Sequence, residues 1–345
     1  MLIANRYSPT GNAQWGGMSE VHECSDDRLS RMVMLKRIKQ PNDVRRLVDE
    51  KKALMKVRSR HVVEMLDIVT YDMMGADETA IILEKIDGNK LAEGGMSFGD
   101  EYLKTIWQII SGIRDIHDAG IIHRDIKPDN ILVDLSGVVK ILDFGLAREV
   151  DKDNKTHSIV GTQSFMAPEL YGDTTRVFST AIDIYAFAVT AVQLIRLPKQ
   201  VLGKTMPEKV EAHFRPLDSP LTDLLIGCLK SNPSERPKAS EIEALLKRRL
   251  TRNLHRARLI NGLTVIEINE QSPQAGLKTK TEQLNIKYDG ENFVCINIVG
   301  TMSVNNIPLQ IGDKIENSCI IIFGATGSSN RAFIPGDISH PEVML

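Results

Sequence analysis

The chain has 345 residues, of which 42% are apolar and 26% charged, a composition that excludes a lone small module and a disordered protein. With 43 Lys and Arg against 45 Asp and Glu, the net charge of −2 argues against a protein that coats nucleic acid through a large positive charge. The four cysteines are widely spaced and form no C-x-x-C pair, so neither a zinc site nor a disulfide framework is indicated.

The first 90 residues alternate short strand-like apolar runs, such as residues 33–38 and 80–83, with one charged helix over residues 44–57. From residue 100 to 258 the pattern is mostly helical. This order predicts a small β-rich lobe over about residues 1–86 and a larger helical lobe over about 87–258.

From residue 259 onward, short apolar runs are separated by turn signals such as Asp289-Gly290 and Gly312-Asp313. This spacing predicts a small all-β domain over residues 259–345. It does not show the Arg and Ser/His pattern of a phosphothreonine-reading forkhead-associated module. We expect a docking partner or an intramolecular contact for it.

The N-terminal residues contain no apolar run of the kind found in signal peptides. The longest apolar runs, such as residues 184–189, are far shorter than the roughly 20 residues that a membrane helix needs. We therefore expect a cytoplasmic protein without a membrane segment and without a nucleic-acid partner.

Three polar segments carry the chemistry of the chain. Residues 123–130 read HRDIKPDN, residues 143–145 read DFG, and residues 167–169 read APE. In this order and spacing they resemble the eukaryotic-type (Hanks-type) Ser/Thr protein kinases over about residues 6–250. The resemblance implies an α+β bilobal kinase fold and transfer of the γ-phosphate of Mg-ATP to Ser or Thr hydroxyls of proteins. The sequence of residues 16–21 suggests a bacterial or bacteriophage origin.

The resemblance assigns roles to the polar side chains of these segments. Asp125 would orient the substrate hydroxyl and accept its proton, and Lys127 would contact the γ-phosphate. Asn130 and Asp143 would hold the Mg²⁺ ions through hard oxygen ligands. Lys127 and Thr162 both match positions that favour Ser/Thr over Tyr substrates.

The N-terminal part of the resemblance supplies the nucleotide site. Lys36 would bind the α- and β-phosphates, with Glu50 positioning it. Gly16 and Gly17 would belong to the loop over the phosphates, although Gln14 and Ser19 replace two of its glycines. The expected adenine contacts are Val21, Leu132 and the hinge from Glu84 to Ile86, with Leu83 as gatekeeper and Met34 at a position usually filled by Ala.

Other matching positions imply support and regulation. Glu169 is expected to pair with Arg236, and Asp183 to hold the backbone of the catalytic loop. Arg124 and Arg148 match cations that receive a phosphate on the activation segment. We therefore expect autophosphorylation at Ser158 or Thr156.

Two alternatives stay open at this point. A pseudokinase or nucleotide-binding scaffold is favoured by Gln14, Ser19 and Met34, whereas the presence of Lys36, Asp125 and Asp143 speaks against it. A small-molecule phosphotransferase of the aminoglycoside type shares a similar Asp and Asn core. It generally lacks Lys127, the APE segment and the partner Arg236.

Overall fold

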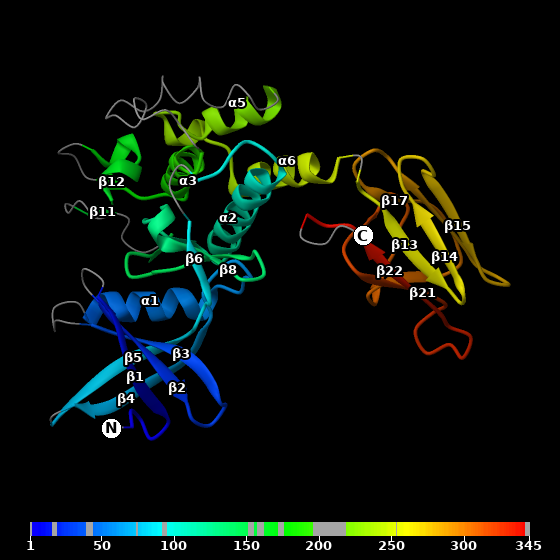
Figure 1. The fold of residues 1–345 in the computed structure, drawn as a ribbon. Helices are drawn as coiled ribbons and strands as arrows, with labels where there is room; N and C mark the ends of the chain where they lie inside the picture. The colour runs from blue at the N-terminus through cyan, green and yellow to red at the C-terminus, as the bar shows by residue number, and fades with distance from the viewer. Residues whose placement is uncertain are drawn as a thin grey trace. The chain divides into compact units, whose positions relative to one another are not determined.

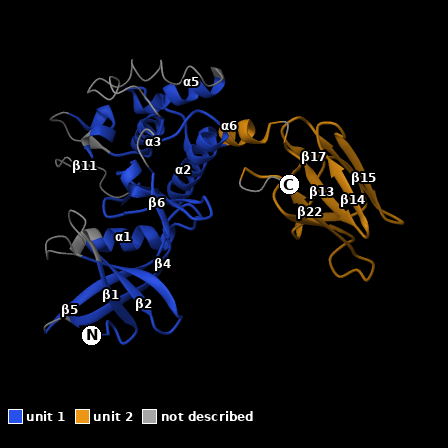
Figure 2. Cartoon of the chain, in the orientation of Figure 1, with its two compact units in different colours: residues 1–243 blue, residues 244–345 orange. Residues whose placement is uncertain are grey.

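The computed structural model describes residues 2–15, 19–38, 44–73, 75–91, 95–150, 155–156, 162–171, 176–195, 219–252 and 254–341 (Figure 1). Contacts divide the chain into two compact units, residues 1–243 and 244–345 (Figure 2). The division falls inside helix α6 (Ala239–Thr251), whereas the sequence places the domain boundary at residue 258, where the helical pattern gives way to strands. No helix of the described residues is long and apolar enough to cross a membrane.

The N-terminal part of unit 1 is a five-stranded antiparallel sheet with one helix. Its strand order is β1-β2-β3-β5-β4. The elements are β1 (Tyr7–Trp15), β2 (Ser19–Asp26), β3 (Arg31–Ile38), α1 (Val44–Lys56), β4 (Met65–Met73) and β5 (Ala76–Glu84). Leu47, Glu50 and Leu54 lie at helical spacing on α1 and are buried, which gives the helix one inward face. The predicted helix and the two predicted strands match α1, β3 and β5.

The rest of unit 1 is mainly helical. Twelve residues of α2 (Asp100–Asp118) and eleven of α3 (Ala181–Gln193) are buried, so these two helices form the centre of this part. Among the described residues the α-helices that follow are α5 (Ser219–Gly227) and α6, which crosses the division between the units. Short 3-10 helices described in this part are η2 (Pro128–Asn130), η3 (Gln163–Phe165), η4 (Pro168–Leu170) and η5 (Pro233–Glu235).

Short strands flank two of the segments that the sequence predicts to be catalytic. Strands β6 (Gly88–Lys90), β8 (Ile131–Asp134) and β9 (Val139–Ile141) form a three-stranded sheet. Two further pairs are β7 (Ile121–Ile122) with β10 (Arg148–Glu149) and β11 (Lys155–Thr156) with β12 (Arg176–Val177). Residues 123–130 therefore lie between β7 and β8, and residues 143–145 lie between β9 and β10.

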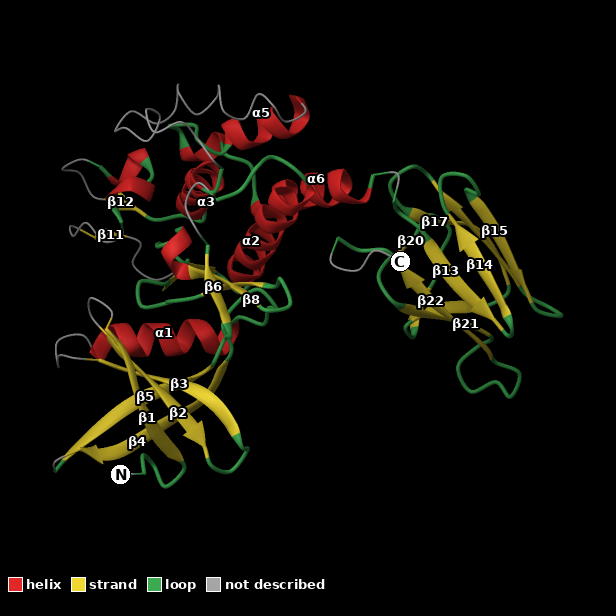
Figure 3. Ribbon diagram, in the orientation of Figure 1, coloured by secondary structure: helices red, strands yellow, loops and turns green. Residues whose placement is uncertain are grey.

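Unit 2 is built from two antiparallel sheets, and every regular element in the described residues after 254 is a strand (Figure 3). The six-stranded sheet has the order β14-β13-β22-β21-β18-β19, and the four-stranded sheet has the order β15-β16-β17-β20. The strands are β13 (Ala257–Asn261), β14 (Thr264–Ile268), β15 (Gln274–Lys278), β16 (Gln283–Tyr288), β17 (Phe293–Val299), β18 (Met302–Val304), β19 (Ile307–Pro308), β20 (Lys314–Ile315), β21 (Cys319–Phe323) and β22 (Ala332–Ile338).

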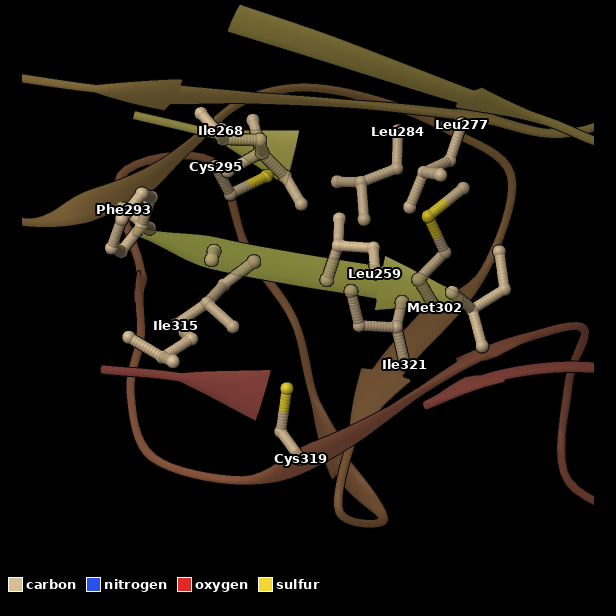
Figure 4. Close-up of a cluster of buried hydrophobic side chains, with 14 of the residues drawn as sticks. Leu259, Ile268, Leu277, Leu284, Phe293, Cys295, Met302, Ile315, Cys319 and Ile321 are labelled. Carbon is tan, nitrogen blue, oxygen red and sulfur yellow. The ribbon is translucent and has the colours of Figure 1, made fainter. Parts of the chain in front are cut away.

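The core of unit 2 contains apolar side chains from both sheets. Leu259 and Ile321 come from the six-stranded sheet, and Leu284 and Cys295 come from the four-stranded sheet (Figure 4). All four are less than 2% exposed. Alternation along strands such as β13, where Ala257 and Leu259 are buried between exposed residues, explains why each sheet presents one apolar face.

A histidine is packed against aromatic side chains of unit 2. The centroid of the His255 ring lies 4.8 Å from that of Phe293 and 5.8 Å from that of Tyr288. Its Nδ1 is 2.7 Å from the Ser339 hydroxyl, which also accepts a hydrogen bond from the backbone N–H of Arg256. Burial lowers the pKa of His255 to about 4, and the positive charge of Lys247 acts in the same direction, against a smaller opposite effect of Glu316. The ring is therefore uncharged at neutral pH.

We expect the free energy of unfolding of unit 2 to fall as the pH drops from about 6.5 towards 4. In this interval the unfolded chain binds a proton on His255 and the folded unit does not, so acid favours the unfolded state. Allowing for the partly exposed ring, we expect a loss of about 1–2 kcal/mol. Hydrogen-exchange mass spectrometry of unit 2 peptides in the full chain measures this effect. The His255→Gln variant should lose that part of the pH dependence, and an unchanged dependence would contradict the prediction.

Candidate active site

A buried lysine joins the two parts of unit 1 that carry the predicted nucleotide and metal residues. Lys36 Nζ, on β3, donates to Glu50 Oε1 of α1 at 2.7 Å and to Asp143 Oδ1 at 2.8 Å. The side chains of Lys36 and Glu50 are 8% and 3% exposed, whereas that of Asp143 is half exposed. The pairing of Lys36 with Glu50 expected from the sequence is confirmed, and Asp143 shares the same lysine.

Electrostatics keep this lysine charged. Burial lowers the pKa of Lys36, but the negative charges of Glu50 and Asp143 outweigh it and hold the pKa above its usual value. For Asp143, burial raises the pKa, while the charge and hydrogen bond of Lys36 dominate and the net shift is downwards. A cation beside an ionised carboxylate suits a site for a metal-bound polyphosphate.

Residues 123–130 form a second hydrogen-bonded group around Asp125. Its Oδ2 accepts from Lys127 Nζ at 2.6 Å and from Asn130 Nδ2 at 2.8 Å, and its Oδ1 accepts from Thr162 Oγ1 at 3.0 Å. Lys127 Nζ also donates to Thr162 Oγ1 at 2.7 Å. These bonds fix the carboxylate of Asp125, and they bring together the four side chains that the sequence singled out here.

The backbone on either side of the site is held in an unusual conformation. Arg124 has a φ of 73° and Asp143 a φ of 59°, both in the left-handed region that non-glycine residues rarely adopt. The Asp183 carboxylate stabilises the first of these turns, because it accepts from the backbone N–H groups of His123 and Arg124 at 2.8 Å each. This confirms the support expected from Asp183.

The donor atoms of Asn130 and Asp143 fit a divalent cation. Asn130 donates through Nδ2 to Asp125, which leaves its amide oxygen for a metal. Asp143 uses Oδ1 for Lys36 and the N–H of Gly145, and within the described residues its Oδ2 has no hydrogen-bond partner. Those residues contain no group of three or more His, Cys, Asp or Glu side chains that could hold a metal. A Mg²⁺ ion here would therefore complete its shell with phosphate oxygens and water.

The expected adenine contacts are distributed over both parts of unit 1. Val21 lies opposite Lys36 in the register of β2 and β3, Leu132 lies in β8, and Glu84 is the last residue of β5. Val21, Ile86 and Leu132 are all partly buried. Their roles in nucleotide binding stay predictions.

Several predicted residues fall outside what the structure describes. Gly16, Gly17 and Ser158 lie outside the described residues. Thr156 is the last residue of β11, and nothing is described of its side chain. The predictions for these four residues therefore stay untested.

One lysine near the site was not found from the sequence. Lys140, on β9, donates through Nζ to Glu84 Oε1 at 2.7 Å. The one signal in the sequence is a lysine between two apolar residues, Val139 and Ile141. Both of these are fully buried, so strand alternation places Lys140 on the opposite face of β9, where it is partly buried. A lysine in that position needs an acidic partner, but the sequence alone does not name one.

A buried ion pair supports the segment after Thr162. Both Nη atoms of Arg236 donate to the Glu169 carboxylate at 2.7 Å, and Arg236 also donates to the carbonyls of Ala181 and Lys230. The Arg236 side chain is fully buried. The predicted pairing of Glu169 with Arg236 is confirmed.

Comparisons with known proteins agree with this geometry. The sequence of residues 14–245 matches the model of the protein kinase domain. A probable serine/threonine-protein kinase of Dictyostelium discoideum is 30% identical in an alignment of 221 residues that covers 59% of this chain and 36% of that protein. The probable serine/threonine-protein kinase PknB of Corynebacterium glutamicum is 28% identical in an alignment of 311 residues that covers 81% of this chain and 47% of the relative.

A third relative is the serine/threonine-protein kinase PkaB of Streptomyces coelicolor, 27% identical in an alignment of 250 residues that covers 66% of this chain and 56% of that protein. The chain thus spans about a third to a little over half of these relatives. The domain match alone covers more than half of its residues. The chain therefore belongs to the protein kinase family.

Proposed function

We propose that the chain is a Ser/Thr protein kinase that transfers the γ-phosphate of ATP, with Mg²⁺, to hydroxyl groups of proteins. The observation that carries this proposal is the contact of Lys36 with both Glu50 and Asp143. It places a charged lysine beside the carboxylate that would ligate the metal. Phosphoryl transfer depends on such positioning and on charge stabilisation.

In the proposed reaction, each side chain has a distinct task. Asp125 orients the substrate hydroxyl and accepts its proton, while Lys36 contacts the α- and β-phosphates and Lys127 the γ-phosphate. Asp143 and Asn130 would hold Mg²⁺, which supplies charge neutralisation on the phosphates when bound. Thr162 and Lys127 already bond Asp125, which supports a Ser/Thr specificity.

The all-β domain is proposed as a separate module. Two lobes, residues 1–86 and 87–258, would form the kinase domain, and residues 259–345 would dock a partner or another part of the chain. The alternation of buried and exposed residues on strands such as β13 and β16 supports an independent sandwich core.

Phosphoamino-acid analysis tests the proposed function. Wild type and Lys36→Met are incubated with radiolabelled ATP, Mg²⁺ and a generic protein substrate, and the labelled protein is acid-hydrolysed. We expect label on Ser or Thr with the wild type and almost none with the variant. Label on Tyr would contradict the specificity, and nucleotide binding without any transfer would support a pseudokinase.

A buried arginine next to the site supports regulation by phosphate. In the described residues Arg124 Nε and Nη2 have no hydrogen-bond partner, although both atoms are buried. Burial and, to a smaller extent, the like charge of Arg148 together lower the pKa of Arg124 to about 10. The open donors of Arg124, with the positive charge of Arg148 nearby, would bind the phosphate of a modified activation segment.

We therefore expect autophosphorylation at Ser158 or Thr156. Intact-mass analysis after incubation with Mg-ATP should show added phosphate on the wild type and none on Asp143→Asn. Replacing both Ser158 and Thr156 by Ala should remove most of the added mass. An active wild type that gains no phosphate would contradict this prediction.

A further inference from the structure

We propose that Lys140 is a positioning residue for nucleotide binding, which acts by holding Glu84 and with it the end of strand β5. The inference deepens the proposed kinase function and rests on it, because the residues from Glu84 to Ile86 are the expected hinge that bonds adenine. Lys140 itself would not touch the nucleotide.

Glu84 is fixed by three hydrogen bonds. Its Oε1 accepts from Lys140 Nζ at 2.7 Å and from the backbone N–H of Glu64 at 2.9 Å. Its own backbone N–H donates to the carbonyl of Glu64 at 2.9 Å. Glu64 and Glu84 are thus connected by two hydrogen bonds, and Lys140 supplies the positive charge that pairs with the Glu84 carboxylate.

The position of Lys140 is well defined, because backbone hydrogen bonds fix its strand β9 against residues 61–63. The N–H of Ile141 donates to the carbonyl of His61 at 2.8 Å, and the N–H of Val63 donates to the carbonyl of Ile141 at 3.0 Å. The side chains of Lys140 and Glu84 are only 14% and 25% exposed. A partly buried ion pair is screened less by salt and water than an exposed one, and its charge-assisted hydrogen bond favours one geometry.

The segment from Lys140 to Asp143 therefore bonds to both strands, β5 and β3, that contribute residues to the proposed nucleotide site. Lys140 bonds Glu84 at the end of β5, and Asp143 bonds Lys36 on the neighbouring strand β3. Without Lys140, the Glu84 carboxylate loses its only cationic partner in the described residues. The cost of that unpaired charge favours a displaced β5 end, and adenine binding would weaken.

The test compares ATP binding with the rate of chemistry in Lys140→Met, Glu84→Gln and the double variant. We expect KM for ATP, and Kd for a fluorescent ATP analogue, to rise about five- to tenfold in each single variant. Because Asp125 and its partners are untouched, kcat should stay within about twofold of wild type. The double variant should be no worse than the worse single variant, since both remove one interaction.

Two further variants serve as controls. Lys140→Arg keeps the charge and should recover most of the affinity. Lys230→Met removes a lysine from an exposed pair with Glu235, in which both side chains are about half exposed, and should change neither constant. If Lys140→Met does not fold, Glu84→Gln, which keeps an acceptor for the N–H of Glu64, carries the test.

Unchanged KM and Kd in an active protein would overturn the role of Lys140 and leave the proposed function intact. Loss of kcat at constant Kd would overturn it as well. A wild type that transfers no phosphate would overturn the proposed function, while the Kd values would still decide for or against the positioning role. A wild type that binds no ATP analogue would overturn both.

Discussion

Replacing Asp125 by asparagine is expected to lower kcat about 10²- to 10⁴-fold, with the affinity for ATP within about twofold of wild type. The carboxylate is the proposed acceptor of the substrate proton, and an amide cannot take that proton. The change is nearly isosteric, and Lys127, Asn130 and Thr162 still surround the side chain. Steady-state kinetics with varied ATP separates the two constants.

Asp129→Asn is the matched control, because Asp129 is exposed and lies four residues further along the same loop. We expect it to leave kcat unchanged. An Asp125→Asn variant that keeps the wild-type kcat would show that this carboxylate is not the proton acceptor.

Replacing Arg236 by methionine is expected to destabilise unit 1 by about 3–5 kcal/mol. The fully buried guanidinium donates to both carboxylate oxygens of Glu169 and to three backbone carbonyls, so its removal leaves several acceptors without a partner. Urea unfolding followed by tryptophan fluorescence reports on unit 1, because both tryptophans, Trp15 and Trp107, lie in it.

An exposed pair is the control for this effect. Glu235→Gln removes the partner of Lys230, with both side chains about half exposed, and should leave the unfolding midpoint close to that of wild type. Equal unfolding midpoints for Arg236→Met and wild type would mean that the Glu169 pair does not stabilise the fold.

The site was largely predictable because its residues occur in recognisable local segments. Asp125, Lys127 and Asn130 lie within six residues of one another, and their mutual hydrogen bonds follow from one loop. Lys36 and Glu50 are 14 residues apart and lie on different elements, β3 and α1, which bring Lys36 Nζ to 2.7 Å from Glu50 Oε1. The resemblance supplied this pairing, since a lysine in a strand and a glutamate in a helix do not by themselves indicate a contact.

Lys140 and Glu84 could not be paired from the sequence. They are 56 residues apart, and their contact depends on where β9 lies relative to the end of β5. The same holds for His255, whose lowered pKa arises from packing against Phe293 and Tyr288. Local patterns predict strands and helices, but not which of them become neighbours.

The all-β character of the C-terminal region was predictable, and the arrangement of its strands was not. Alternating apolar residues and turn signals such as Asp289-Gly290 indicate strands in sequence order. In the order β14-β13-β22-β21-β18-β19, the first strand of unit 2, β13, pairs with the last one, β22, although they are far apart in the sequence. Periodicity carries no information about such non-local pairing.

The proposed kinase activity is tested most directly by Mg²⁺-dependent transfer of label from γ-labelled ATP to protein, with wild type and Asp143→Asn side by side. Asp143 bonds Lys36 and presents the carboxylate that would hold the metal, so we expect strong Ser/Thr labelling by the wild type. The variant should lose at least about 100-fold of this activity. Equal labelling by the two proteins would contradict the proposed kinase chemistry at this site.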